Sequence, residues 1–94
     1  MVRVTNAAKR QLKAVAEERE LDPGKFLRLA VPPAWTGEGD FGIVIDARGG
    51  MAVDIKLGDR TVLLVEQVVD EQLLRSILDF KKPADGARFT LDVF

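Results

Sequence analysis

The sequence lacks several residues on which protein chemistry usually depends. Its 94 residues include no cysteine, no histidine and no tyrosine. Without cysteine there is no disulfide, no thiolate zinc site and no metal cluster held by this chain's own thiolates. Without histidine the most frequent general base and nitrogen ligand is missing. Carboxylates, lysines, arginines and backbone amides remain, so we expect no enzyme activity, no catalytic residue and no cofactor or metal.

The sequence also lacks an excess of either charge and a long apolar run. It carries 14 basic and 15 acidic side chains, a balance that argues against nucleic-acid binding. Its start does not resemble a secretory signal and no apolar run approaches a membrane span, so we expect a cytoplasmic protein with no membrane contact. A chain of 94 residues suffices for one core, which predicts a single domain over residues 1–94.

Alternating apolar and polar residues predict strands linked mainly by short turns. The predicted strands cover residues 2–4, 25–31, 41–46, 51–57, 61–65 and 88–94. The run TVLLV at 61–65 is apolar throughout, which is typical of the most buried strand. Gly58 and Asp59 fit a two-residue hairpin, and residues 22–24 fit a turn. In the last strand we expect Phe89, Leu91 and Val93 to face inward.

Two segments show the helical period. Thr5 can cap a helix that begins at Asn6. Asp70 can cap a second helix, which Pro83 and Gly86 would end. Its predicted apolar stripe consists of Leu73, Leu74, Ile77, Leu78 and Phe80. Few helices among short-turn strands predict an α+β domain that is compact, β-rich and mainly antiparallel, with two flanking helices.

The segment 32–42, PPAWTGEGDFG, interrupts this regular pattern. Two prolines and three glycines prevent a continuous element, and the only tryptophan of the chain lies between them. Gly37, Gly39 and Gly42 spell G-x-G-x-x-G, but a strand follows them where a nucleotide site needs a helix. We therefore predict an interaction loop. Its candidate residues are Trp35, Thr36, Gly37, Glu38, Asp40 and Phe41.

Several of these residues allow two interpretations. The Trp35 ring either covers part of the core or anchors a partner. Glu38, Asp40 and Asp46 either bind a hard cation or are solvated loop acids. Arg28 lies opposite the leucines of its strand, where an outward arginine on a half-solvated sheet is expected. Phe94 allows the same two interpretations as Trp35, and of these the core is preferred.

Taken in order, the motifs resemble the HesB/IscA family of A-type iron–sulfur carriers. The resemblance covers about residues 4–94. Its motifs are an opening T-x-x-A helix, L-R-L-x-V at 27–31, a glycine loop, G-D-R-T-V-L-L-V at 58–65, I-L-D-F at 77–80 and G-x-R-F-T at 86–90. It implies a compact β-rich fold with two helices that often forms dimers or tetramers.

The same resemblance implies cluster ligands that this sequence does not contain. The family has a cysteine in a G-C-x-G loop after the L-R-L-x-V strand and a C-G-C pair in a C-terminal tail. Counting on from Val31 places Thr36 at the first cysteine's position and Trp35 at the glycine's, and the tail pair has no counterpart. A threonine hydroxyl is a poor substitute for a thiolate on iron.

The function expected from these features is that of a HesB-like domain without its cysteine ligands. It would act as a non-enzymatic interaction or accessory protein, with a protein partner in the iron–sulfur assembly machinery. The alternative is a small-ligand or hard-metal binding protein that uses the 32–42 loop. We expect the final predicted strand, 88–94, to lie at a sheet edge, and such edges invite pairing with a second copy.

Overall fold

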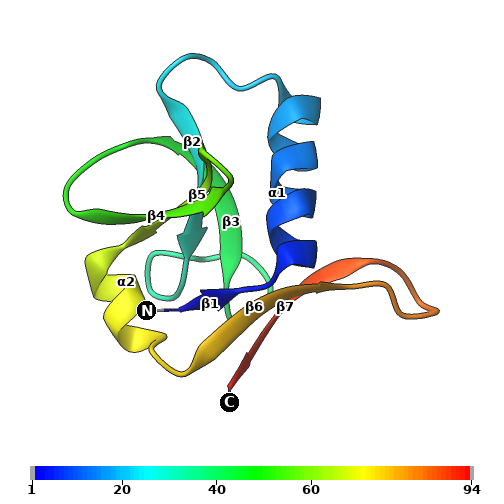
Figure 1. Cartoon of the computed structure of the whole chain (residues 1–94). Helices are drawn as coiled ribbons and strands as arrows, with labels where there is room; N and C mark the ends of the chain where they lie inside the picture. Colours follow the sequence, from blue (N-terminus) through cyan, green and yellow to red (C-terminus); the bar gives the residue numbers. More distant parts are fainter. Residues whose placement is uncertain (1, 94) are drawn as a thin grey trace.

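Two small β-sheets and the longer of two helices pack together in the structure, a computed structural model that describes residues 2–93 (Figure 1). In chain order the elements are β1 (Arg3–Val4), α1 (Asn6–Arg19), β2 (Lys25–Ala30), β3 (Gly42–Ala47), β4 (Ala52–Leu57), β5 (Arg60–Glu66), α2 (Gln67–Gln72), β6 (Ser76–Lys81) and β7 (Arg88–Val93). Helix α1 contacts strands of both sheets. Neither helix among the described residues is long and apolar enough to cross a membrane.

The strand order explains how distant segments meet. One sheet has the order β3-β2-β5-β4 and the other β1-β6-β7. The pairs β2–β3, β4–β5 and β6–β7 are antiparallel, whereas β2–β5 and β1–β6 are parallel. The predicted α+β class and mainly antiparallel arrangement are therefore confirmed. Strand β7 lies at a sheet edge, as predicted for residues 88–94.

The core forms where α1 meets both sheets. Leu12 of α1, Leu29 of β2 and Leu63 of β5 are each fully buried in it. The predicted cap at Thr5 is confirmed, because its Oγ1 accepts a hydrogen bond from the Ala8 backbone N–H at 3.1 Å. The same hydroxyl donates to Asp79 Oδ1 at 2.6 Å, a bond that lowers the pKa of the Asp79 carboxyl. The Thr5 side chain thus caps the start of α1 and also links the helix to β6 by a hydrogen bond.

Two further local predictions are confirmed. Residues 62–65 are all buried and belong to β5, an internal strand of its sheet. Gly58 has a φ of 63° at the first position of the turn that joins Leu57 to Arg60. Glycine adopts this left-handed conformation without steric cost, so the turn fixes the β4–β5 hairpin.

The predicted second helix is wrong over most of its length. Helix α2 ends at Gln72, and residues 76–81 form strand β6 between β1 and β7. Asp70 lies within α2, where Glu66 occupies the N-cap position. The predicted stripe is split, because Leu78 is fully buried while Leu74 is 52% exposed. Pairing with strands distant in sequence overrides the helical period here, since a short apolar run fits either structure.

The last strand departs from its predicted pattern at one residue. Phe89 packs against Phe80 with ring centroids 5.0 Å apart, as an inward residue should. Val93, also predicted to face inward, is 82% exposed. Figure 1 shows the reason, because the end of β7 runs away from α1 and the four-stranded sheet. Phe94, assigned to the core, lies outside the described residues.

Candidate functional site

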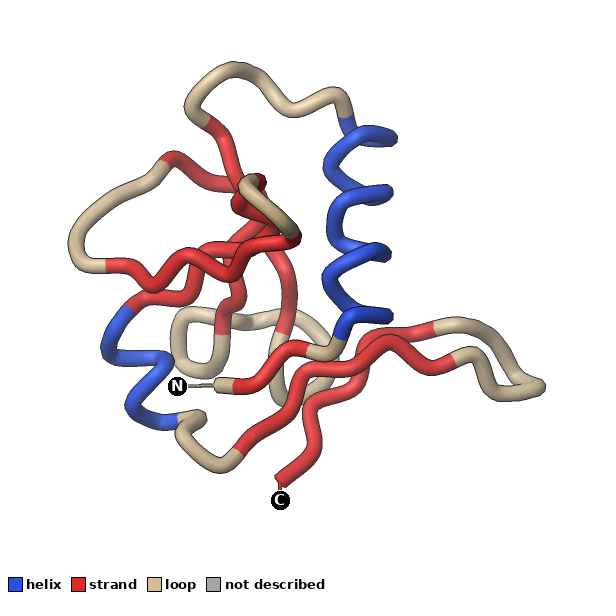
Figure 2. Tube along the Cα trace, viewed as in Figure 1, coloured by secondary structure: helices blue, strands red, loops and turns tan. Residues whose placement is uncertain are grey.

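The candidate loop, residues 32–42, connects two neighbouring antiparallel strands. It leaves the end of β2 and returns to the start of β3, and appears as a long tan segment between red strands in Figure 2. The Pro32–Pro33 peptide bond is cis. The backbone N–H of Trp35 donates to the backbone carbonyl of Val31 at 3.0 Å, and this bond turns the chain directly after β2. The loop therefore has a defined start.

Trp35 folds back over its own loop. Its indole Nε1 donates to the Glu38 carbonyl oxygen at 3.0 Å. The ring occupies the space where a Cβ on Gly37 or Gly42 would stand, so only glycine allows this packing at both positions. The side chain is half-buried. The ring thus covers the first residue of β3, as the core interpretation expects, and still presents part of its surface to solvent.

The other predicted loop residues divide into exposed and packed ones. Thr36, Gly37, Glu38 and Asp40 are exposed. Phe41 is half-buried and packs against the core cluster. The loop therefore has a packed base and an exposed, acidic tip next to the indole.

The structure does not gather the acidic residues proposed for a hard cation. Asp46, at the other end of β3, bonds to Arg28. Across residues 2–93 no group of three carboxylates is placed to hold a metal ion. The donor set that a hard cation prefers is therefore not formed by Glu38, Asp40 and Asp46.

Arg28 is more enclosed than an outward, solvated arginine would be. Its guanidinium donates to Glu66 Oε1 at 2.6 Å and to Asp46 Oδ2 at 3.1 Å, and its side chain is only 21% exposed. Its Nε is buried and has no hydrogen-bond partner among residues 2–93. As predicted, Arg28 lies on one face of the sheet, and Leu27 and Leu29 lie on the other.

A second arginine cluster lies beside the first on the same sheet. Arg48 donates twice to the Asp54 carboxylate, and Thr61 donates to Asp54 Oδ2 at 2.7 Å. These hydrogen bonds, that of Arg48 foremost, lower the pKa of Asp54 to about 2. Arg48 also stacks over the Phe26 ring, 5.3 Å from its centroid. Neither cluster was predicted from the sequence, because the pairing of these residues depends on strand register. The alternation of charged residues within each strand indicates only which face of the sheet they share.

Comparisons with known proteins identify the fold. No protein-family model and no curated protein sequence matches the chain. The crystal structure of IscA with the [2Fe–2S] cluster is similar, with a TM-score of 0.58 and 19% identity over 99% of this chain and 82% of that one. Escherichia coli SufA, described as involved in the biosynthesis of iron–sulfur clusters, gives a TM-score of 0.63 and 17% identity over 98% and 84%. The chain has a HesB/IscA-like fold.

Proposed function

We propose that this chain is a non-enzymatic, cytoplasmic accessory protein of iron–sulfur cluster biogenesis that binds a partner protein through its 32–42 loop. The observation that carries the proposal is the combination of an IscA-like fold over 99% of this chain with a cysteine-free loop closed by Trp35. Fold alone does not determine function, so the argument rests on the chemistry and surface of this loop.

The chemistry of the loop disfavours cluster carriage. The position that the family resemblance assigns to the first cysteine is Thr36, an exposed side chain whose neutral hydroxyl binds iron poorly. Iron–sulfur clusters in proteins are held mainly by thiolates, with histidine as the usual substitute, and these 94 residues contain neither. The same shortage of general bases and nucleophiles supports a non-enzymatic role.

The surface of the loop suits protein recognition. Tryptophan is enriched among the residues that dominate binding interfaces. The Trp35 ring is held by its bond to the Glu38 carbonyl and by contact with two glycines, so little freedom is lost when a partner covers it. Glu38 and Asp40 are exposed next to it and favour a partner with basic groups.

Replacing Trp35 tests the contact. We expect iron–sulfur assembly proteins to be enriched on the immobilised wild-type protein from an extract of the native cell. Trp35→Ala should lower their recovery about tenfold or more, the effect of losing one dominant anchor of 1.4 kcal/mol or more. Quantitative mass spectrometry measures the recovery. Val68→Ala, which removes an exposed apolar side chain of α2, serves as the matched control and should bind as the wild type does. Equal recovery with Trp35→Ala would exclude the loop as the contact.

Anaerobic reconstitution tests the absence of a cluster independently. With iron and sulfide added and small thiols removed, we expect no visible absorption band and no bound iron after desalting, because the sequence offers no thiolate. The absorption spectrum and an iron assay measure both quantities. A stable chromophore with stoichiometric iron would overturn the accessory interpretation, whatever the outcome of the binding experiment.

A further inference from the structure

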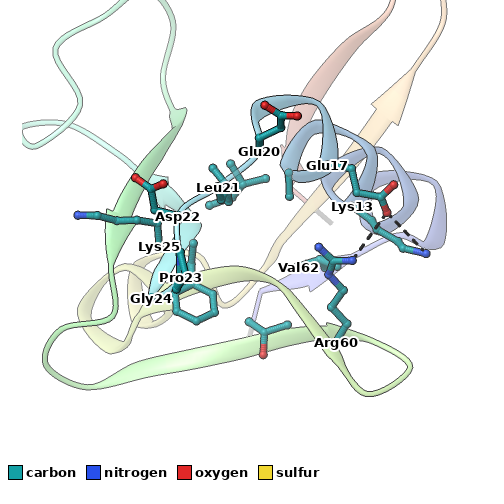
Figure 3. A pocket seen from close by; sticks show the side chains of 14 residues that line it. Lys13, Glu17, Glu20, Leu21, Asp22, Pro23, Gly24, Lys25, Arg60 and Val62 are labelled. Atoms are coloured by element: carbon teal, nitrogen blue, oxygen red, sulfur yellow. Dashed lines mark ion pairs between the residues drawn. The ribbon is translucent and has the colours of Figure 1, made fainter.

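A hollow at the opposite end of β2 from the candidate loop is not explained by the proposed function. It lies between the C-terminal half of α1, the turn at residues 21–24 and the start of β5, and has a volume of about 480 Å³ (Figure 3). Gly24 has a φ of 83° in that turn, and the Lys25 N–H donates to the Asp22 carbonyl at 3.0 Å. The volume falls in the range typical of small-molecule sites.

The hollow has an apolar floor and a charged rim. The floor residues are Ala16, Leu21, Phe26, Leu27 and Val62. Leu27 and Val62 are buried members of the core, so this part of the floor is rigid. Such a surface suits the hydrocarbon part of a ligand.

Lys13, Glu17 and Arg60 converge on one side of the rim (Figure 3). Glu17 Oε1 is 3.9 Å from Lys13 Nζ and 3.7 Å from Arg60 Nη1. Both distances exceed the normal range of a hydrogen bond, and about half of each side chain is exposed. Exposed pairs of this kind contribute little free energy, so an incoming group can replace them at low cost.

The charges on this side of the rim favour an anion. Lys13 and Arg60 face the single carboxylate of Glu17 on this side, whereas the whole lining is balanced by Lys25 on one hand and Glu20 and Asp22 on the other. Figure 3 shows the remaining charged side chains elsewhere, with Lys25 and Asp22 on the opposite side and Glu20 at the upper edge. Lys13 precedes the last turn of α1, so the negative end of the helix dipole does not oppose an anion at that position.

We propose that this hollow binds a small amphiphilic carboxylate. The carboxylate lies between Lys13 and Arg60, where the planar guanidinium of Arg60 donates two parallel hydrogen bonds. The apolar body of the ligand covers Ala16 and Leu21, the half-buried apolar side chains of the floor. The site shares no residue with the 32–42 loop, so it stands or falls independently of the proposed function.

A titration with three related probes tests this arrangement. Octanoate carries both features of the predicted ligand, octanol lacks the charge and acetate lacks the apolar body. In ¹⁵N-resolved NMR spectra of the full chain, we expect octanoate to shift the backbone amides of Leu21, Lys25 and Thr61 in a saturable way. We expect octanol and acetate to bind at least about tenfold more weakly, since each loses one of the two contributions. Equal affinity for octanoate and either fragment overturns the proposal.

Substitutions on the rim then locate the binding site. Arg60→Gln and Lys13→Gln should each weaken octanoate binding about tenfold, the effect of losing one charge-assisted contact. Arg88→Gln is the matched control, because Arg88 is similarly exposed and pairs with Asp85 on the β6–β7 hairpin. Another hollow, of about 510 Å³, lies on a different face of α1 and includes Arg19. Loss of octanoate binding in Arg19→Gln with retention in Arg60→Gln would overturn the proposed location.

Discussion

The substitution Gly42→Ala is expected to expel the Trp35 ring from its place over the start of β3. A Cβ at this position would overlap the indole, whereas the backbone conformation of residue 42 does not itself require glycine. Overpacking of this kind costs about 1–3 kcal/mol of unfolding free energy. Because the chain has one tryptophan, its fluorescence should shift to longer wavelength as the ring enters water. Urea denaturation and the emission spectrum measure the two effects.

Two further variants separate ring displacement from a general effect of alanine. Gly49→Ala places a Cβ in open space, so both the stability and the emission should remain close to those of the wild type. In a Trp35→Ala background the ring is gone, so Gly42→Ala should cost much less than it does alone. Such non-additivity is the signature of direct contact between two residues. Additive effects, or an unchanged emission maximum in Gly42→Ala, would show that the ring does not rest on residue 42.

Leu78→Ala is expected to lower the unfolding free energy by about 2–5 kcal/mol, the cost of removing a fully buried leucine. Leu78 lies in β6 between Val4 of β1 and Leu91 of β7, so the cavity would open where the small sheet meets the core. Urea denaturation of the wild type and the variant measures the difference.

Leu74→Ala provides the matched control for this prediction. Leu74 and Leu78 are four residues apart and would share one face of a helix. In the structure Leu74 precedes β6 and is 52% exposed, so its substitution should change stability by less than about 0.5 kcal/mol. Equal losses for the two variants would favour the helix that the sequence pattern predicts over the strand that the structure shows.

These two leucines also show where prediction from sequence ends. The cap at Thr5 and the turn at Gly58 were predictable because each depends on a few adjacent residues. Strand β6 was not, because its partners include β1, more than 70 residues earlier in the chain. A run such as I-L-D-F suits a helix as well as a strand until such a partner is known.

Composition predicted the break between strands at residues 32–42, but the internal arrangement of this loop was not predictable. Prolines and glycines mark residues 32–42 as a break between strands, which the structure confirms. The position of the Trp35 ring depends on contact with Gly42 in three dimensions. The enclosure of Arg28 likewise depends on the register that brings Asp46 and Glu66 to either side of it. The alternation in the sequence predicts which face of the sheet each side chain occupies. It does not predict which residue of the next strand lies beside that side chain.

The parallel pairing of β1 with β6 has a consequence for how the chain folds during synthesis. The four-stranded sheet spans residues 25–66 and can assemble as soon as that segment has left the ribosome. The three-stranded sheet must wait for residues 76–93, because its first strand comes from the opposite end of the described chain. Contacts between such distant segments slow folding, since a long loop must close before they form. Until then α1 lacks the part of its packing surface that β6 supplies, so we expect the nascent chain to expose apolar residues of α1 to chaperones until β6 has been made.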